Sequence, residues 1–264
     1  MFIEYLGRWG LTPDGHPILS RNSHLLPVRW RGATAMLKVA LEAEEEVGGA
    51  LMEWWGGEGA ARVLAIERNA ILLERAQGKA SLADFARHGR DDEASRIICA
   101  VVTKLHAPRT EPPPYLVPLQ RWFRELKPAA AAHGGILAAS AATARELLAA
   151  HREVVALHGD IHHGNILDFG ERGWLAIDPK GLIGERGFDY ANLFCNPDYE
   201  TASAPGRLAC QIEVVAGTAR LERRRLLEWV LAWAGLSAAW HMGDGTPPET
   251  ALLVAEIAAA QLSV

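Results

Sequence analysis

The sequence predicts an α+β protein whose first part is rich in β-strands and whose second part is mostly helical. Short apolar runs separated by turn residues occupy the chain up to about residue 74, and amphipathic helical patterns follow from about residue 91. With 264 residues, of which 49% are hydrophobic, the chain can build one large or two small domains around a proper core. We expect the boundary between the two parts in the polar segment 74–78, which ends in glycine.

Five strands and one helix are expected in the first part. Strand-like runs lie at residues 18–20, 25–30 and 35–40, and residues 62–66 and 71–74 form a candidate hairpin. Residues 42–55 have a helical pattern that ends at the glycine pair 56–57.

Helices are expected to dominate the second part. Asp91 can cap a helix with one apolar face, and Pro108 stops that helix. A proline-rich connector and a buried strand at 154–157 are also expected, together with a loop at 181–197 that contains one short helix. The other predicted helices lie at residues 119–126, 141–150, 207–219, 222–242 and 249–262.

The composition disfavours several classes of protein. A net charge of −5 argues against nucleic-acid binding and is compatible with a cationic substrate. No apolar run is long enough to span a bilayer, and the N-terminus has no secretory signal pattern, so we expect no membrane partner. Cys99, Cys195 and Cys210 lack metal-like spacing and are interpreted as reduced thiols of a cytoplasmic protein.

The densest group of polar residues follows the strand predicted at 154–157. Residues 158–165 read as a loop that leaves this strand, and residues 165–169 and 174–177 read as the two arms of a hairpin. This geometry brings Asp160, Asn165 and Asp178 close together. Two carboxylates and an amide oxygen at one place suit a hard cation and a general base.

The spacing of His158, Asp160 and Asn165 resembles the protein-kinase catalytic loop, H-R-D-x-x-x-x-N, with glycine in place of the arginine. In that chemistry Asp160 accepts the proton of an attacking hydroxyl, while Asn165 and Asp178 hold Mg²⁺ against the phosphates of a nucleotide. Residues 168–170 spell Asp-Phe-Gly, the metal-binding string of protein kinases, but they lie inside the predicted hairpin. We therefore assign the metal-binding role to Asp178.

Lys38 is the candidate phosphate-binding lysine of the first part. It is the sole lysine before Lys79 and lies within an apolar strand, where an ammonium group is costly unless it is paired. The alternative is a lysine on the wet face of an edge strand. Kinases pair such a lysine with a glutamate of the following helix; Glu44, Glu45 and Glu46 are available, and we favour Glu46.

Further nucleotide contacts are expected from one turn and from the boundary segment. No G-x-G-x-x-G motif exists near the N-terminus, and the turn 20–23, including Ser23, offers hydroxyl and backbone N–H groups to phosphates instead. Adenine is expected to bond backbone groups between Glu74 and Ala76.

Two other groups of residues admit alternative interpretations. His158, His162 and His163 could suggest the zinc site of a hydrolase, but we favour hydrogen bonds that brace the loop. Trp240, on a long helix near Asp244, either packs in the core or borders a pocket where it stacks on a sugar ring or a cation.

The complete motif, residues 158–165 followed by 177–179, resembles the aminoglycoside phosphotransferases, whose loop commonly reads H-G-D-x-H-x-x-N. Further segments are similar to the streptomycin 6-phosphotransferase subgroup, which is grouped with hydroxyurea kinases. These segments are residues 36–40, 72–76, 172–179, 181–185, 188–192 and 236–240. The likeness covers most of the chain.

The resemblance implies a two-lobed, protein-kinase-like fold, with an N-lobe at residues 1–77 and a helical C-lobe at residues 78–264. It implies ATP and Mg²⁺ as cofactors and a phosphate transferred to a hydroxyl. Carried over by motif, Asp160 is the base, Asn165 and Asp178 bind Mg²⁺, Lys38 binds phosphate and Glu46 orients Lys38. Substrate contacts are expected from Glu185, Asp189, Trp240 and Asp244.

The function expected from the resemblance is phosphorylation of streptomycin at its 6-hydroxyl by a monomeric enzyme, giving antibiotic resistance. One alternative keeps the fold and changes the acceptor to hydroxyurea or another small hydroxylated metabolite. Another is a nucleotide-binding pseudokinase that serves as a binding module. The complete set of Lys38, Asp160, Asn165 and Asp178 argues against the pseudokinase.

Overall fold

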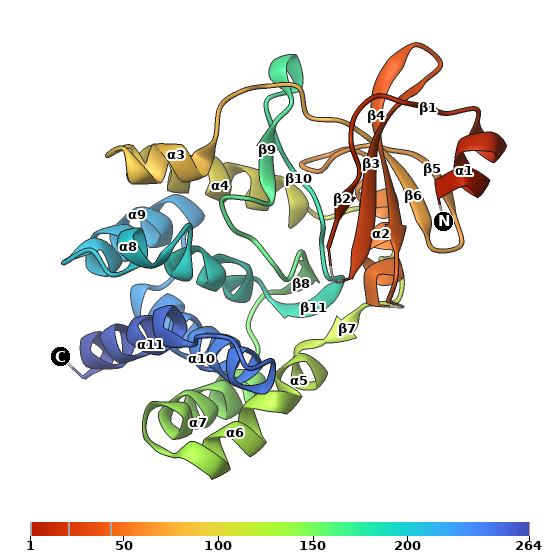
Figure 1. Cartoon of the computed structure of the whole chain (residues 1–264). Helices are drawn as coiled ribbons and strands as arrows, with labels where there is room; N and C mark the ends of the chain where they lie inside the picture. The colour runs from red at the N-terminus through yellow and green to blue at the C-terminus, as the bar shows by residue number, and fades with distance from the viewer. Residues whose placement is uncertain (1, 21, 43, 264) are drawn as a thin grey trace.

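The structure, a computed structural model, describes residues 2–20, 22–42 and 44–263. Its first part is an antiparallel sheet in the order β1-β3-β4-β6-β5, with β2 paired to β3 (Figure 1). The strands are β1 (Thr12–Pro13), β2 (Ile18–Leu19), β3 (Ser23–Trp30), β4 (Ala33–Ala40), β5 (Val63–Glu67) and β6 (Ala70–Glu74). The five predicted strands are thus present, and β1 is an addition.

One face of this sheet packs against a small core, and the other face lines a cavity. Along β4, Ala35, Leu37 and Val39 are buried in a small core of the sheet, which also contains Tyr5 of α1 (Phe2–Trp9). Because side chains alternate along a strand, Lys38 points to the opposite face, where a cavity lies. The sequence analysis did not predict α1.

The helix α2 (Glu44–Trp55) packs with its C-terminal half on the larger core, through Leu51, Met52 and Trp55. It ends at Gly56 and Gly57, whose φ values of 60° and 87° lie in the left-handed region that glycine adopts without steric cost. The predicted helix at 42–55 is therefore confirmed over residues 44–55.

Helices make up most of the second part. They are α3 (Leu82–Arg87), α4 (Asp91–Leu105), α5 (Leu119–Trp122), α6 (Leu126–His133), α7 (Gly135–Ala149), α8 (Tyr199–Ala202), α9 (Arg207–Ala219), α10 (Arg223–Gly243) and α11 (Glu249–Leu262). Short 3-10 helices lie at η1 (Phe123–Glu125), η2 (Gly170–Arg172) and η3 (Arg186–Cys195). The bounds of α9 and α11 are those predicted. The helix predicted at 119–126 is divided between α5, η1 and the start of α6.

The long helix α10 is the centre of the helical part. It packs against α7, α11 and η3, and its side chains from Leu226 to Ala239 are almost all buried. Such a helix is apolar on all sides, which is typical of a core helix rather than of a surface helix. No helix among the described residues is both long and apolar enough to cross a membrane.

Two small sheets connect the helical part to the first part. A three-stranded sheet contains β7 (Val117–Pro118), β11 (Leu182–Glu185) and β8 (Val154–Leu157), and β9 (Ile166–Asp168) forms the predicted hairpin with β10 (Trp174–Ala176). The hairpin reaches the segment between β6 and α3, where the Gly78 N–H donates to the Asp168 carbonyl oxygen at 2.9 Å. An ion pair between Arg172 and Glu74 joins the same two regions. The hairpin therefore holds the sheet against the helices (Figure 1).

Candidate active site

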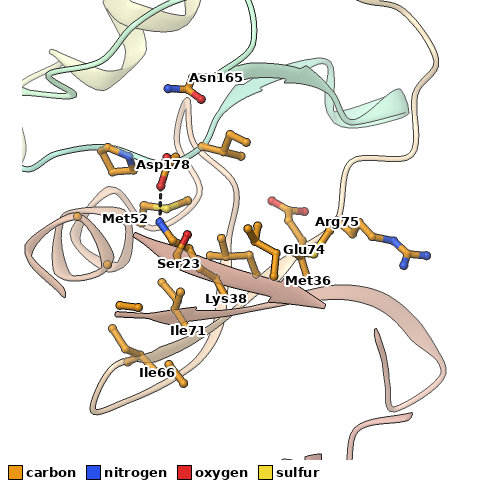
Figure 2. A pocket seen from close by; sticks show the side chains of 18 of the residues that line it. Ser23, Met36, Lys38, Met52, Ile66, Ile71, Glu74, Arg75, Asn165 and Asp178 are labelled. Atoms are coloured by element: carbon orange, nitrogen blue, oxygen red, sulfur yellow. Dashed lines mark hydrogen bonds and ion pairs between the residues drawn. The ribbon is translucent and has the colours of Figure 1, made fainter. Parts of the chain in front are cut away.

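A cavity of about 430 Å³ lies between the N-terminal sheet and the β9–β10 hairpin. Met36 and Ile71 contribute apolar walls from the sheet, and Leu167 contributes one from the hairpin. Figure 2 shows this cavity, in which Lys38 from β4 points at Asp178 from the loop after β10. A cavity with apolar walls that also contains a lysine and a carboxylate suits a ligand that has a flat apolar part and an anionic part.

Lys38 and Asp178 form an ion pair across the cavity. Burial by itself would raise the pKa of Asp178, but the charges of Lys38 and Lys180 outweigh that effect and hold this pKa at about 2. Asp178 also has a φ of 62°, in the left-handed region that costs a non-glycine residue about 1–3 kcal/mol. An ionised carboxylate held in a strained backbone at a cavity wall is typical of a functional position.

Asp160 lies in the loop after β8, and two amide groups fix its carboxylate. Asn165 Nδ2 donates to Asp160 Oδ2 at 3.2 Å and to the Asp160 carbonyl oxygen at 2.9 Å, and Asn192 Nδ2 donates to Asp160 Oδ1 at 2.8 Å. Because Asn165 uses its nitrogen for these bonds, its Oδ1 is left as an acceptor. Asn165 lines the first cavity and Asp160 lines a second one, so the pair marks the boundary between them.

His158 connects Asp160 to the segment that carries Asp178. Its Nε2 lies 2.8 Å from the Ile177 carbonyl oxygen, and its Nδ1 accepts from the Asp160 N–H at 3.2 Å. Since a carbonyl oxygen can only accept, Nε2 must carry the proton. Burial lowers the pKa of His158, so the ring stays neutral in this role. His158 therefore braces the loop through a backbone carbonyl, as predicted.

The second cavity, of about 500 Å³, opens on the other side of Asp160. Trp240 lies in its wall, with Trp122 at a ring-centroid distance of 5.5 Å and an angle of 76°. Lys180 and Asn192 also line it. Trp240 was predicted to border such a pocket, whereas Trp122 and Asn192 were not predicted to contact the substrate. Their distances along the chain from Asp160 gave no indication that the fold would bring them together.

Asp189 lies inside the protein and does not reach either cavity. Its carboxylate accepts from the N–H groups of His158 at 2.9 Å and Gly159 at 2.7 Å, and it contacts His106 Nε2 at 2.8 Å. Its exposed fraction is 1%. The predicted contact with substrate is therefore wrong, and Asp189 instead holds the start of the catalytic loop in place.

Glu185 has a structural position of the same kind. Its carboxylate pairs with Arg225 at 2.6 Å and accepts from Trp229 Nε1 at 2.9 Å and from the Arg152 N–H at 3.0 Å. The predicted substrate contact is wrong here too, because these three donors hold both oxygens away from the cavities. Asp244 is exposed after the end of α10 and is not among the described residues that line the second cavity.

The remaining predicted nucleotide contacts all line the first cavity: Ser23, Glu46, Glu74 and Ala76. Glu46 is exposed there, and none of the ion pairs between described residues joins it to Lys38. The side chains of Glu44 and Glu45 and the residue Arg21 in the predicted turn lie outside the described part of the chain.

The histidines do not form a metal centre. Among the described residues, no three His, Cys, Asp or Glu side chains are grouped so that they could hold a metal ion, so this geometry gives the zinc alternative no support. The ring of His162 accepts from the Gly164 N–H at 3.0 Å, so it bonds an N–H group rather than a carbonyl. His163 is buried, and burial lowers its pKa to about 3.

Comparison with known proteins agrees with this geometry. A family model described as an aminoglycoside/hydroxyurea antibiotic resistance kinase matches residues 8–245. The chain belongs to this kinase family. The kinase is 54% identical over 243 residues to streptomycin 3''-kinase of Klebsiella pneumoniae, with 90% of this chain and 91% of the relative covered.

Two further relatives are less similar. Hydroxyurea phosphotransferase of Kitasatospora aureofaciens is 31% identical to the kinase, with 96% of this chain and 76% of the relative covered. Streptomycin 6-kinase of Streptomyces griseus is 30% identical, with 96% and 85% covered. The names of these relatives all describe phosphotransferases, so the kinase is an enzyme rather than a pseudokinase.

Solved structures confirm the two-lobed, protein-kinase-like fold. The kinase aligns with the aminoglycoside phosphotransferase APH(4)-Ia, in a ternary complex with ADP and hygromycin B, at a TM-score of 0.69 and 13% identity, with 99% of this chain and 97% of that chain covered. It aligns with choline kinase from Cryptosporidium parvum at a TM-score of 0.65 and 12% identity, with 94% and 88% covered. At such identities the likeness establishes the fold alone.

Proposed function

We propose that the kinase transfers the γ-phosphoryl group of ATP to a hydroxyl of streptomycin. The observation that carries the proposal is the position of Asp160 between two cavities. One cavity contains the Lys38–Asp178 pair and suits a nucleotide, and the other has tryptophan walls and suits an acceptor. An in-line transfer needs its donor and its acceptor on opposite sides of such a boundary.

The residues present fit Mg²⁺. Mg²⁺ prefers hard oxygen ligands, and Asp178 offers a carboxylate whose pKa of about 2 keeps it ionised, while Asn165 offers Oδ1. The bound ion would neutralise charge on the phosphates of the nucleotide. Lys38 would contact the same phosphates from β4, and Glu46 remains its proposed partner.

Asp160 would act as the base. Asn165 and Asn192 each donate to one of its carboxylate oxygens, so the carboxylate is oriented before an acceptor arrives. It would accept the hydroxyl proton as the acceptor oxygen bonds to the γ-phosphorus and the bond from that phosphorus to the β–γ bridging oxygen breaks. Most of the rate enhancement would come from positioning and charge neutralisation.

The walls of the acceptor cavity suit a substrate that carries cationic guanidinium groups. Aromatic faces attract guanidinium groups, which streptomycin carries, and the wall of the cavity contains Trp122, Trp233 and Trp240. The names of the relatives support streptomycin but divide between two hydroxyls. Streptomycin 3''-kinase, which is 54% identical, supports phosphorylation of the 3''-hydroxyl. Streptomycin 6-kinase, which is 30% identical, and the sequence motifs support the 6-hydroxyl.

Turnover with ATP, Mg²⁺ and each candidate acceptor tests the proposal, and NMR of the product identifies the phosphorylated hydroxyl. We expect turnover with streptomycin and a loss of about 10²–10⁴-fold in Asp160→Asn, with nucleotide binding retained. Phosphorylation of hydroxyurea in place of streptomycin would favour the alternative of a hydroxyurea kinase, which the relative hydroxyurea phosphotransferase supports. Near-wild-type turnover by Asp160→Asn would contradict the assignment of the base.

We also propose that the enzyme acts as a cytoplasmic monomer, that it confers antibiotic resistance, and that its lobes meet between residues 77 and 78. Light scattering tests whether the enzyme is a monomer. Growth of an expressing strain on streptomycin tests whether it confers resistance.

A further inference from the structure

Lys180 is a charged residue of the acceptor cavity whose backbone is fixed to the catalytic loop. Its N–H donates to the His158 carbonyl oxygen at 2.7 Å. A Cβ atom added to Gly159 would lie 3.2 Å from Lys180 Cβ and 2.8 Å from the Leu182 side chain, so the two segments approach as closely as a glycine permits. The side chain of Lys180 therefore starts from a point that is set by the residues next to Asp160.

Two lysines approach Asp178 from the two cavities. Lys38 pairs with Asp178 Oδ1 and lines the first cavity, whereas Lys180 Nζ lies 3.5 Å from Asp178 Oδ2 and lines the second. If the kinase acts as proposed, the phosphoryl group would move from the cavity that Lys38 lines to the cavity that Lys180 lines.

The charge of the acceptor cavity changes during the reaction. Lys180 is the one Lys or Arg among the described residues that line it, and the acidic residues there are Asp160 and Asp198. The transferred phosphoryl group adds negative charge beside these carboxylates, which is unfavourable without a cation at short range. Lysine is a common phosphate ligand because its ammonium group acts as a compact point charge.

We propose that Lys180 is a second catalytic lysine, which contacts the transferring phosphoryl oxygens from the acceptor side and holds the phosphorylated product. This inference rests on the proposed function. The acceptor oxygen bonds to the γ-phosphorus, the bond to the β–γ bridging oxygen breaks, ADP retains that oxygen, and the hydroxyl proton goes to Asp160. Lys180 contributes charge and takes no part in the proton transfer.

Lys180→Met removes the charge and keeps most of the side-chain length, and Lys180→Arg keeps the charge. We expect kcat for streptomycin to fall about 10²–10³-fold in Lys180→Met, with the KM for ATP within about threefold of wild type and partial recovery in Lys180→Arg. Lys127→Met, on the exposed surface of α6, is the matched control.

Binding of purified phosphostreptomycin separates this role from a structural one. We expect Lys180→Met to weaken binding of the phosphorylated product at least tenfold while binding of streptomycin itself changes little, because only the product carries the phosphate. Equal losses for both ligands, or a wild-type kcat, would overturn the inference. If Lys180→Met does not fold, binding of phosphostreptomycin and of streptomycin is compared in Lys180→Gln instead, with the same expected results. Absence of turnover by the wild-type enzyme with streptomycin would instead overturn the proposed function and this inference with it.

Discussion

Replacement of Asp189 by asparagine tests whether this carboxylate supports the catalytic loop or binds substrate. The carboxylate accepts from the backbone N–H groups of His158 and Gly159 and contacts His106, at 2.7–2.9 Å. Alanine would leave three buried donors without an acceptor, at about 1–3 kcal/mol each, which approaches the whole stability of a typical domain. Asparagine keeps one oxygen and is the safer substitution.

The expected cost of Asp189→Asn follows from those three contacts. If the retained oxygen occupies the position of Oδ2, it still accepts from His158 and faces His106, but the new amide group faces the N–H of Gly159. One buried donor then costs about 1–3 kcal/mol, and the loss of charge in the other two bonds costs about 1 kcal/mol each. We therefore expect a destabilisation of about 3–5 kcal/mol.

Urea unfolding and steady-state kinetics measure the two consequences of Asp189→Asn. We expect a lower midpoint at an unchanged m-value, and a fall in kcat of about tenfold or more because the residue before Asp160 is displaced. Asp84→Asn, in an exposed ion pair, is the control and should cost no more than about 1 kcal/mol. A variant with the wild-type midpoint and a raised KM for streptomycin alone would refute the reasoning and restore a substrate role.

Four other outcomes follow from the structure. Glu185→Gln should lower the urea midpoint without raising the KM for streptomycin, because its donors are structural; a raised KM at unchanged stability would contradict this. Trp240→Leu should raise the KM for streptomycin about 3- to 30-fold and leave the KM for ATP unchanged. Gly48→Ala should lower kcat/KM for ATP, because the added Cβ would lie 2.0 Å from the Pro179 carbonyl oxygen, next to Asp178. Gly217→Ala is the control, because its added Cβ meets no atom within 4 Å and should leave kcat/KM unchanged. The folded protein lowers the pKa of Asp178 from the ordinary 3.8 to about 2. The ionised carboxylate should therefore stabilise the fold fully above about pH 5, and this stabilisation should disappear toward pH 2. The difference in unfolding free energy between wild type and Asp178→Asn, followed against pH, measures it.

Elements with strong local patterns were predicted well from the sequence. The strands 25–30 and 35–40, the hairpin at 62–74 and the helices 207–219 and 249–262 each have their own periodicity and turn residues, and the structure contains all of them. The helix α1 was missed because it is only eight residues long, so its amphipathic pattern extends over only about two turns. Helix α7 begins earlier than predicted, at Gly135, and its additional first turns bury Leu137 and Ser140.

The catalytic loop could be predicted because its residues lie close together in the sequence. Asp160 and Asn165 are five residues apart in one loop, and a hairpin of predictable length brings Asp178 back toward them. Spacing of this kind fixes geometry through the backbone alone. The family resemblance rests on the same residues.

The carboxylates beyond that loop were misjudged because a sequence does not show where a side chain points. Glu185 ends β11 and Asp189 lies in η3, near enough to Asp178 in sequence to suggest a substrate contact. Only the packed structure shows that their partners are Arg225, the backbone of the loop after β8, and His106.

The sequence by itself thus predicted an α+β fold from local periodicity, and its motifs indicated the family and the candidate phosphotransfer residues, which lie close together in the chain. The tertiary structure decided what surrounds those residues. It bonded Asn192 to Asp160, placed Trp122 in the wall of the same cavity, and buried two acidic residues away from the cavities. It also placed Lys180 between this cavity and Asp178. Such contacts join residues that are distant in sequence, and only the burial of a common core brings them together.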